Sequence, residues 1–109
     1  MRNILSRRGL FFVGLLLFAY VTPATAETAR VTIDNFAFTP AVLQVKAGTV
    51  VTFLNRDDIP HSVVSEGGAF RSRPLDTDES FAFTFAKAGE FPYFCGLHPY
   101  MKAKIVVVP

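Results

Sequence analysis

The stretch Cys95-Gly96-Leu97-His98-Pro99-Tyr100-Met101 places a thiol, an imidazole and a thioether within one short segment. After residue 26, only one other residue of these three types occurs, His61, which follows a proline in a loop-like segment. One thiolate, two imidazoles and one thioether form a trigonal copper site with a weak axial sulfur, which transfers single electrons. The sequence therefore predicts that His61, Cys95, His98 and Met101 bind one copper ion, which alternates between Cu(II) and Cu(I).

Each of these residues has an ordinary structural role when it is considered alone. An isolated Cys is usually a small buried hydrophobe, and a Met usually fills a gap in a core. Core packing gives no reason, however, for all four to share one layout. The combination therefore favours a metal site over four unrelated packing residues.

Two other sites with the same residues fit less well. Structural zinc prefers several thiolates or more imidazoles, with paired cysteines two residues apart. A nucleophilic pair of Cys95 and His98 would leave His61 and Met101 without a role, and no oxyanion donors are evident. We therefore expect a protein that is not an enzyme.

Residues 1–26 have the three parts of a secretory signal peptide. Arginines form a basic start, residues 10–21 form an apolar run, and Ala24-Thr25-Ala26 precedes the expected cleavage point. The apolar run is too short to span a membrane, which needs about 20 helical residues. The sequence predicts an export signal over residues 1–26 and one copper domain over residues 27–109, soluble in the periplasm and not membrane-bound.

The route of export stays open. Ser6-Arg7-Arg8-Gly9-Leu10-Phe11 resembles a twin-arginine signal, which exports folded proteins. The run rich in Phe and Leu fits the general secretory route equally well. The choice decides whether metal is loaded before or after export.

The charge of the mature domain argues against a nucleic-acid partner. The chain has 11 Lys and Arg and 9 Asp and Glu, and the three arginines of the export signal are removed with it. This leaves 8 basic and 9 acidic residues, a formal net charge of −1. No Lys/Arg block remains that could neutralise a row of phosphates.

Short alternating segments separated by turn residues predict a β-sandwich in the mature domain. Such a small exported domain often needs a disulfide or a metal, and a single cysteine leaves only the metal. The first expected strand continues through Phe36 and Phe38, and Pro40 closes it. Phe81, Phe83 and Phe85 alternate, so that all three face the core. The expected strands cover residues 31–38, 43–46, 49–54, 62–65, 81–85, 91–95 and 103–108.

These segments resemble the cupredoxins, the small blue copper proteins, and most closely the amicyanin and pseudoazurin branch. Val51-Thr52-Phe53-Leu54-Asn55-Arg56-Asp57-Asp58-Ile59-Pro60-His61 is similar to the segment with the first histidine. Gly89-Glu90-Phe91-Pro92-Tyr93-Phe94-Cys95 and His98-Pro99-Tyr100-Met101-Lys102 are similar to the C-terminal ligand loop. Two residues between His98 and Met101 is the short spacing of amicyanins.

The resemblance implies an all-β fold, a Greek-key β-sandwich. It makes His61, Cys95 and His98 the equatorial ligands and Met101 the axial ligand. It also implies that His98 is the electron port and emerges through an apolar patch. The candidate residues of this patch are Pro60, Leu97, Pro99 and Tyr100.

One residue departs from the family pattern. Many cupredoxins have Asn directly after the first histidine, where this chain has Ser62. Ser62 can still offer its backbone amide to the Cys95 sulfur and a shorter bridge through its hydroxyl. Asn55 is expected to be a structural turn residue at a strand end.

The implied function is that of a monomeric periplasmic electron carrier. It would accept an electron from a donor dehydrogenase or cytochrome and pass it to an acceptor cytochrome, docking transiently near His98. The alternative is a copper carrier or buffering protein that delivers copper to a cuproenzyme. Additional Met or His residues outside the site would favour the alternative, and the mature domain has none.

Overall fold

The computed structural model describes residues 27–109, so the predicted export signal lies outside the described residues. Residues 27–109 form eight strands and no helix. No segment of this part of the chain is therefore a helix long and apolar enough to cross a membrane. The strands are β1 (Thr28–Asp34), β2 (Ala37–Thr39), β3 (Val42–Lys46), β4 (Thr49–Asn55), β5 (Val64–Ser65), β6 (Ser80–Phe85), β7 (Gly89–Phe94) and β8 (Lys102–Val108).

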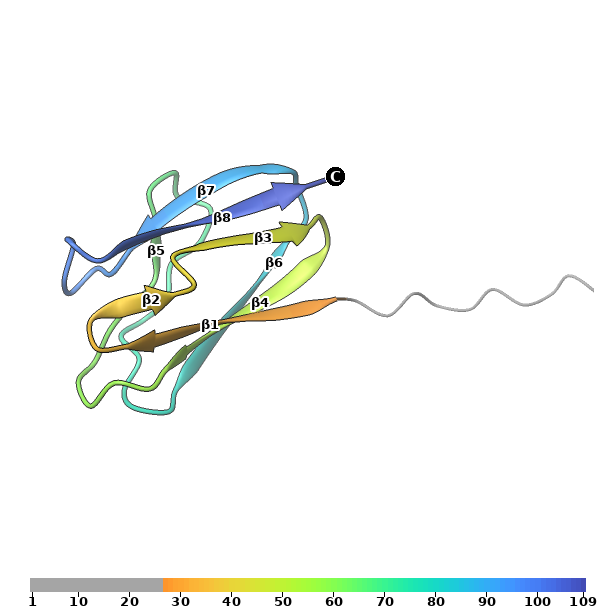
Figure 1. Ribbon diagram of the computed structural model, residues 1–109. Helices are drawn as coiled ribbons and strands as arrows, with labels where there is room; N and C mark the ends of the chain where they lie inside the picture. The colour runs from red at the N-terminus through yellow and green to blue at the C-terminus, as the bar shows by residue number, and fades with distance from the viewer. Residues whose placement is uncertain (1–26) are drawn as a thin grey trace, which may run out of the picture.

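The strands form two four-stranded sheets, in the orders β2-β1-β4-β6 and β3-β8-β7-β5 (Figure 1). Strands β1 and β4 pair in parallel, as do β3 and β8, whereas the other neighbours are antiparallel. The chain changes sheet at every step from β2 to β7, so that only the pairs β1 and β2 and β7 and β8 follow each other within one sheet. This arrangement confirms the predicted all-β, Greek-key sandwich.

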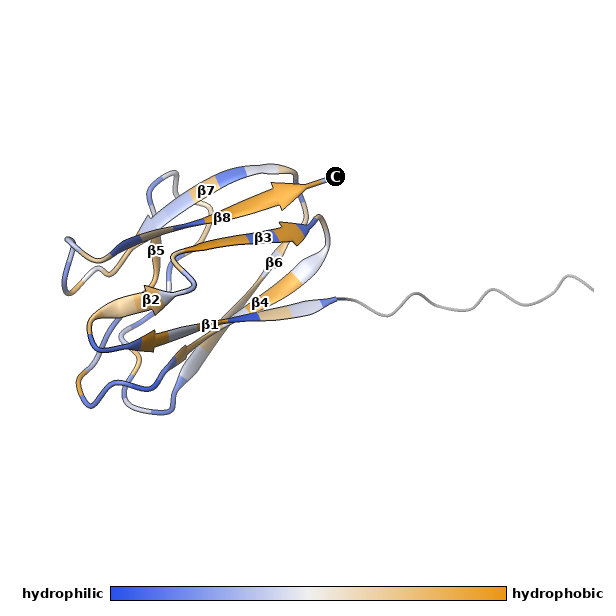
Figure 2. Cartoon of the chain, viewed as in Figure 1, coloured by the Kyte–Doolittle hydropathy of each residue, from blue (hydrophilic) through white to orange (hydrophobic). Residues whose placement is uncertain are grey.

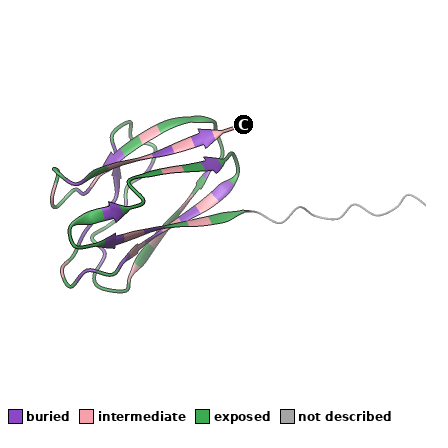
Figure 3. Cartoon of the chain, viewed as in Figure 1, coloured by how far each residue is buried: buried purple, intermediate pink, exposed green. Residues whose placement is uncertain are grey.

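Apolar side chains from both sheets fill the space between them. Buried residues alternate with less buried ones along β1, along β4 and in the second half of β8, where most residues are apolar (Figures 2 and 3). The Tyr93 ring packs edge-on against Phe38 and Phe53, with centroids 4.8 and 5.3 Å away. Phe85 is buried and Phe81 and Phe83 pack against the core, which confirms their predicted role in packing.

The first expected strand proved to be two strands. Residues 31–38 do not run straight, because Asn35 and Phe36 form a tight turn between β1 and β2, in which Asp34 pairs with Ala37. Both turn residues have positive φ, 51° and 58°. Ile33 and Phe36 are three residues apart, so the apolar alternation shifts phase where the chain turns, and Phe36 is a turn residue.

Candidate metal centre

His61, Cys95 and His98 converge at one end of the sandwich, although His61 lies in the loop after β4 and the other two in the loop after β7 (Figure 1). One ligand atom from each residue lies within 4.8 Å of the others. The Cys95 sulfur is 3.6 Å from Nδ1 of His61 and 3.7 Å from Nδ1 of His98. His61 and Cys95 are fully buried, and His98 is partly buried.

These separations match the dimensions of a single metal site. A first-row metal binds sulfur at about 2.3 Å and imidazole nitrogen at about 2.0 Å, so a tetrahedral or trigonal angle requires a sulfur–nitrogen separation of about 3.5 to 3.7 Å. Both observed distances, 3.6 and 3.7 Å, lie in this range. A thiolate with two imidazoles suits copper. The three donors therefore already have the spacing that one ion needs.

Backbone hydrogen bonds shape the loop that contains Cys95, His98 and Met101. The His98 amide donates to the Cys95 carbonyl at 3.2 Å, and the Met101 amide donates to the His98 carbonyl at 2.9 Å. The Cys95 amide in turn donates to the Met101 carbonyl at 3.1 Å. The three residues thus form a closed backbone ring, and the buried Met101 side chain belongs to the same core cluster as Cys95.

The backbone of His61 is held by the neighbouring loop. Its amide donates to the Leu75 carbonyl at 3.1 Å and its carbonyl accepts from the Leu75 amide at 2.7 Å. Asn55, at the end of β4, uses its side-chain amide to donate to the carbonyls of Ile59 and Leu75 at 2.9 and 2.8 Å. This confirms the structural role predicted for Asn55, which ties the two loops around His61 together.

A buried carboxylate, Asp57, orients the His61 ring. Its Oδ2 lies 2.8 Å from Nε2 of His61 and accepts from the Phe36 amide at 3.1 Å. The hydrogen bond with His61, followed by that with the Phe36 amide, lowers the pKa of Asp57 below its usual value. The carboxylate is therefore charged at neutral pH. A proton held on Nε2 leaves Nδ1 free on the side that faces Cys95.

Ser62 joins the two ligand loops. Its backbone amide donates to the Cys95 sulfur at 3.3 Å, and its Oγ accepts from the Gly96 amide at 2.9 Å. Both contacts predicted for Ser62 are therefore present. A Cβ at Gly96 would lie only 2.8 Å from this Oγ, so the loops can approach this closely because residue 96 is glycine.

Replacing Ser62 with alanine should loosen this junction. The Gly96 amide would lose its partner, and an unsatisfied polar group of this kind costs about 1–3 kcal/mol when it is buried. Because Gly96 is exposed and water can reach it, we expect a loss near the lower end, about 1 kcal/mol. Urea unfolding measures the loss of stability, and hydrogen exchange of the Gly96 amide measures the loss of its hydrogen bond. An exchange rate equal to that of the unchanged protein would contradict the bridge.

All four residues proposed for the apolar patch are exposed. Leu97 and Tyr100 are the larger of them, with 47% and 69% of their surface exposed, and Pro60 and Pro99 flank the histidines. The Tyr100 ring stands edge-on to the His98 ring, with centroids 6.3 Å apart. His98 is therefore the most exposed of the three clustered donors, next to apolar surface residues.

The sequence did not reveal two residues of the site, Asp57 and Phe36. The Phe36 ring stands edge-on to both imidazoles, with its centroid 5.4 Å from that of His61 and 5.2 Å from that of His98. Asp57 stands four residues before His61 in a charged loop, where no periodicity indicates which acidic side chain turns inward.

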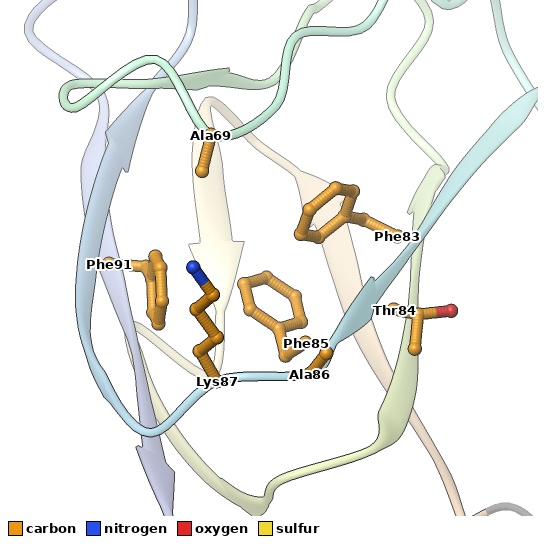
Figure 4. A pocket seen from close by; sticks show the side chains of 7 residues that line it. All are labelled: Ala69, Phe83, Thr84, Phe85, Ala86, Lys87 and Phe91. Atoms are coloured by element: carbon orange, nitrogen blue, oxygen red, sulfur yellow. The ribbon is translucent and has the colours of Figure 1, made fainter.

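An apolar hollow of about 260 Å³ lies elsewhere on the domain (Figure 4). Phe83, Phe85 and Phe91 line it together with Lys87, near the connection from β6 to β7. Cys95, in contrast, follows the far end of β7. The hollow is therefore separate from the metal centre.

Comparison with known proteins identifies the family. A family model described as a cupredoxin-like domain matches residues 9–107. The amicyanin of Paracoccus versutus is 33% identical over 87 residues, which cover 75% of this chain and 66% of that protein. The purple cupredoxin of Nitrosopumilus maritimus superposes with a TM-score of 0.70 at 30% identity, covering 73% of this chain and 99% of that one. A reduced mutant of amicyanin superposes with a TM-score of 0.69 at 31% identity, covering 72% of this chain and 80% of that one.

These matches agree with the two mixed sheets and with the His-Cys-His cluster. The donor spacing also fits the one copper ion that the sequence predicts. The chain therefore belongs to the cupredoxin family, near its amicyanin branch, and copper is the cofactor that its metal centre matches.

Proposed function

We propose that this chain is a periplasmic electron-transfer protein that binds one copper ion through His61, Cys95, His98 and Met101. One observation carries the proposal: donor atoms of His61, Cys95 and His98 meet within 4.8 Å, although they come from loops far apart in the sequence. When bound, copper supplies a one-electron couple between Cu(II) and Cu(I). No substrate is transformed, so the protein is not an enzyme.

The protein contributes a rigid set of donors. The backbone ring of Cys95, His98 and Met101 and the paired hydrogen bonds of His61 with Leu75 restrict movement of the ligands. A donor set that keeps the same positions in both oxidation states needs little rearrangement when an electron arrives or leaves. Met101 supplies a weak axial thioether, and the Ser62 amide donates to the thiolate and tunes its electron density.

Electrons enter and leave through His98. It is the only one of the three clustered donors that is not fully buried, and exposed Leu97, Pro99 and Tyr100 adjoin it in the chain. With Pro60, which precedes His61, they form the proposed apolar patch. A small apolar surface suits brief encounters with partners. The donor is a dehydrogenase or a cytochrome and the acceptor is a cytochrome, and the chain meets them as a monomer.

The predicted export signal at residues 1–26 supports a periplasmic location. Copper delivery to a cuproenzyme is the competing function, and the geometry favours it less. A carrier must release its metal readily, whereas His61 and Cys95 have no exposed surface.

Loading with copper tests the proposed function directly. The mature protein should bind one Cu(II), turn intensely blue, and lose the colour reversibly on addition of one electron. It should then exchange electrons with a cytochrome faster than it yields copper to a chelator. A protein that stays colourless with Cu(II), or that gives up copper faster than electrons, would contradict the proposal.

A further inference from the structure

The turn between β1 and β2 has an unusual residue at its second central position. Asn35 and Phe36 connect the paired residues Asp34 and Ala37, and both have positive φ, as in a type I′ turn. Such turns strongly prefer Asn followed by Gly. Asn35 fits this preference, but Phe36 stands where glycine is expected.

A phenylalanine with positive φ is disfavoured, because its Cβ crowds the backbone in the left-handed region. Such residues persist only where their surroundings hold them, and they concentrate at functional sites. The surroundings of Phe36 supply this restraint, since its amide donates to Oδ2 of Asp57, the oxygen that also contacts Nε2 of His61. The disfavoured backbone conformation of Phe36 is thus stabilised by a hydrogen bond to Asp57, which also contacts His61 in the metal centre.

The ring of Phe36 lies against both imidazoles. It meets His61 at 90° and His98 at 83°, with centroid separations of 5.4 and 5.2 Å. Its outer side is open, with 41% of the residue exposed, while His61 beneath it has no exposed surface. The partly exposed Phe36 ring therefore packs against buried His61 and against one side of His98, which itself remains partly exposed.

We infer that Phe36 is a positioning and shielding residue of the metal centre, which limits the movement of the His61 and His98 rings and slows the loss of the metal. This inference rests on the proposed function only in that these two rings bind copper. Metal can leave when an imidazole swings away and water or a chelator takes its place. His98 is the partly exposed ligand, and the Phe36 ring blocks one side of that movement.

Three substitutions distinguish the effect of the Phe36 ring from the effect of backbone strain in the turn. Phe36→Ala removes the ring and keeps a Cβ at positive φ, whereas Phe36→Gly removes the ring and relieves the strain. Phe36→Leu keeps apolar bulk at the same place. Val42→Ala, at an apolar residue with 59% of its surface exposed on β3, is the matched control.

Release of Cu(I) to excess bicinchoninate is the first measurement. We expect both the Ala and the Gly variants to release copper about tenfold faster, at the lower end of the effect of losing a residue that orients a ligand. Phe36→Leu should restore most of the slow release, and Val42→Ala should match the unchanged protein. Equal rates in all five proteins, or a Leu variant as fast as the Ala variant, would overturn the inference.

A second measurement needs no copper. In the metal-free protein, the Phe36 ring should displace the NMR signals of the His61 and His98 ring protons, and the Ala and Gly variants should both lose this displacement. The Gly variant should also melt at a higher temperature than the Ala variant, because it relieves the turn. Unchanged histidine signals would overturn the inference even in a protein that fails to turn blue, whereas failure to turn blue counts only against the proposed function.

Discussion

Replacing Cys95 with serine is expected to abolish the blue colour and to weaken Cu(I) binding by more than about 100-fold, beyond the 10- to 100-fold range typical of losing an outer partner of a ligand. The colour arises from the bond between thiolate and Cu(II), and a hydroxyl, which stays protonated at neutral pH, cannot replace it. Serine fits the fully buried position, and its oxygen can accept a hydrogen bond from the Ser62 amide, which donates to the Cys95 sulfur in the unchanged protein. The fold should therefore survive while the copper chemistry is lost.

Met101→Leu is the matched control, because it removes the other sulfur of the site and conserves volume in the core. As the thioether is the weak axial donor of the proposed site, this variant should keep an intense colour and one bound copper. Visible absorption and competition with a Cu(I) chelator measure both variants. A Cys95→Ser protein that remains blue, or a colourless Met101→Leu protein, would show that the roles of the two sulfurs are assigned wrongly.

The four proposed ligands could be found from the sequence because the relevant residue types are scarce. After residue 26 the chain has one Cys, two His and one Met, and three of them lie in one segment, so few combinations had to be considered. The strands β4 and β6 could also be predicted, since β-branched residues are frequent over residues 49–54 and phenylalanines occupy every second position over residues 81–85. Composition and local sequence pattern therefore predicted a β-sandwich and the candidate donors, whereas the Greek-key topology was implied by the resemblance to the cupredoxins.

Asp57 and Phe36 could not be found in this way, because their roles depend on where loops lie in space. Asp57 follows Arg56 and precedes Asp58, a run that resembles an ordinary solvated turn, and only the folded loop buries it against His61. Phe36 is one of the apolar residues of the expected strand over residues 31–38, and no glycine marks the turn that it occupies. The structural roles of Asp57 and Phe36 thus differ from the roles that the local sequence pattern predicts, as is common at functional sites.

Replacing Asp57 with asparagine is expected to raise the reduction potential of the copper-loaded protein. The Asp57 carboxylate contacts Nε2 of His61 and favours the higher charge of Cu(II) over Cu(I). The amide oxygen of asparagine can still accept from His61 and from the Phe36 amide, so the charge is lost and the His61 ring stays oriented. The Asp58 amide, which donates to Oδ1 of Asp57, loses its acceptor in this variant. A tenfold change in preference toward Cu(I) corresponds to an increase of about 59 mV for one electron.

Asp57→Ala should differ from Asp57→Asn, because it removes the orientation as well as the charge. The His61 ring and the Phe36 amide would both lose their partner, and copper affinity should fall by about 10- to 100-fold, whereas the asparagine variant should bind close to normally. Asp58→Asn is the matched control: it removes the same charge from the adjacent, exposed residue, where solvent and salt screen it. Voltammetry and chelator competition measure the two effects. If Asp58→Asn raised the potential as much as Asp57→Asn, the net charge of the loop would account for the shift, and the direct contact with His61 would have no special role.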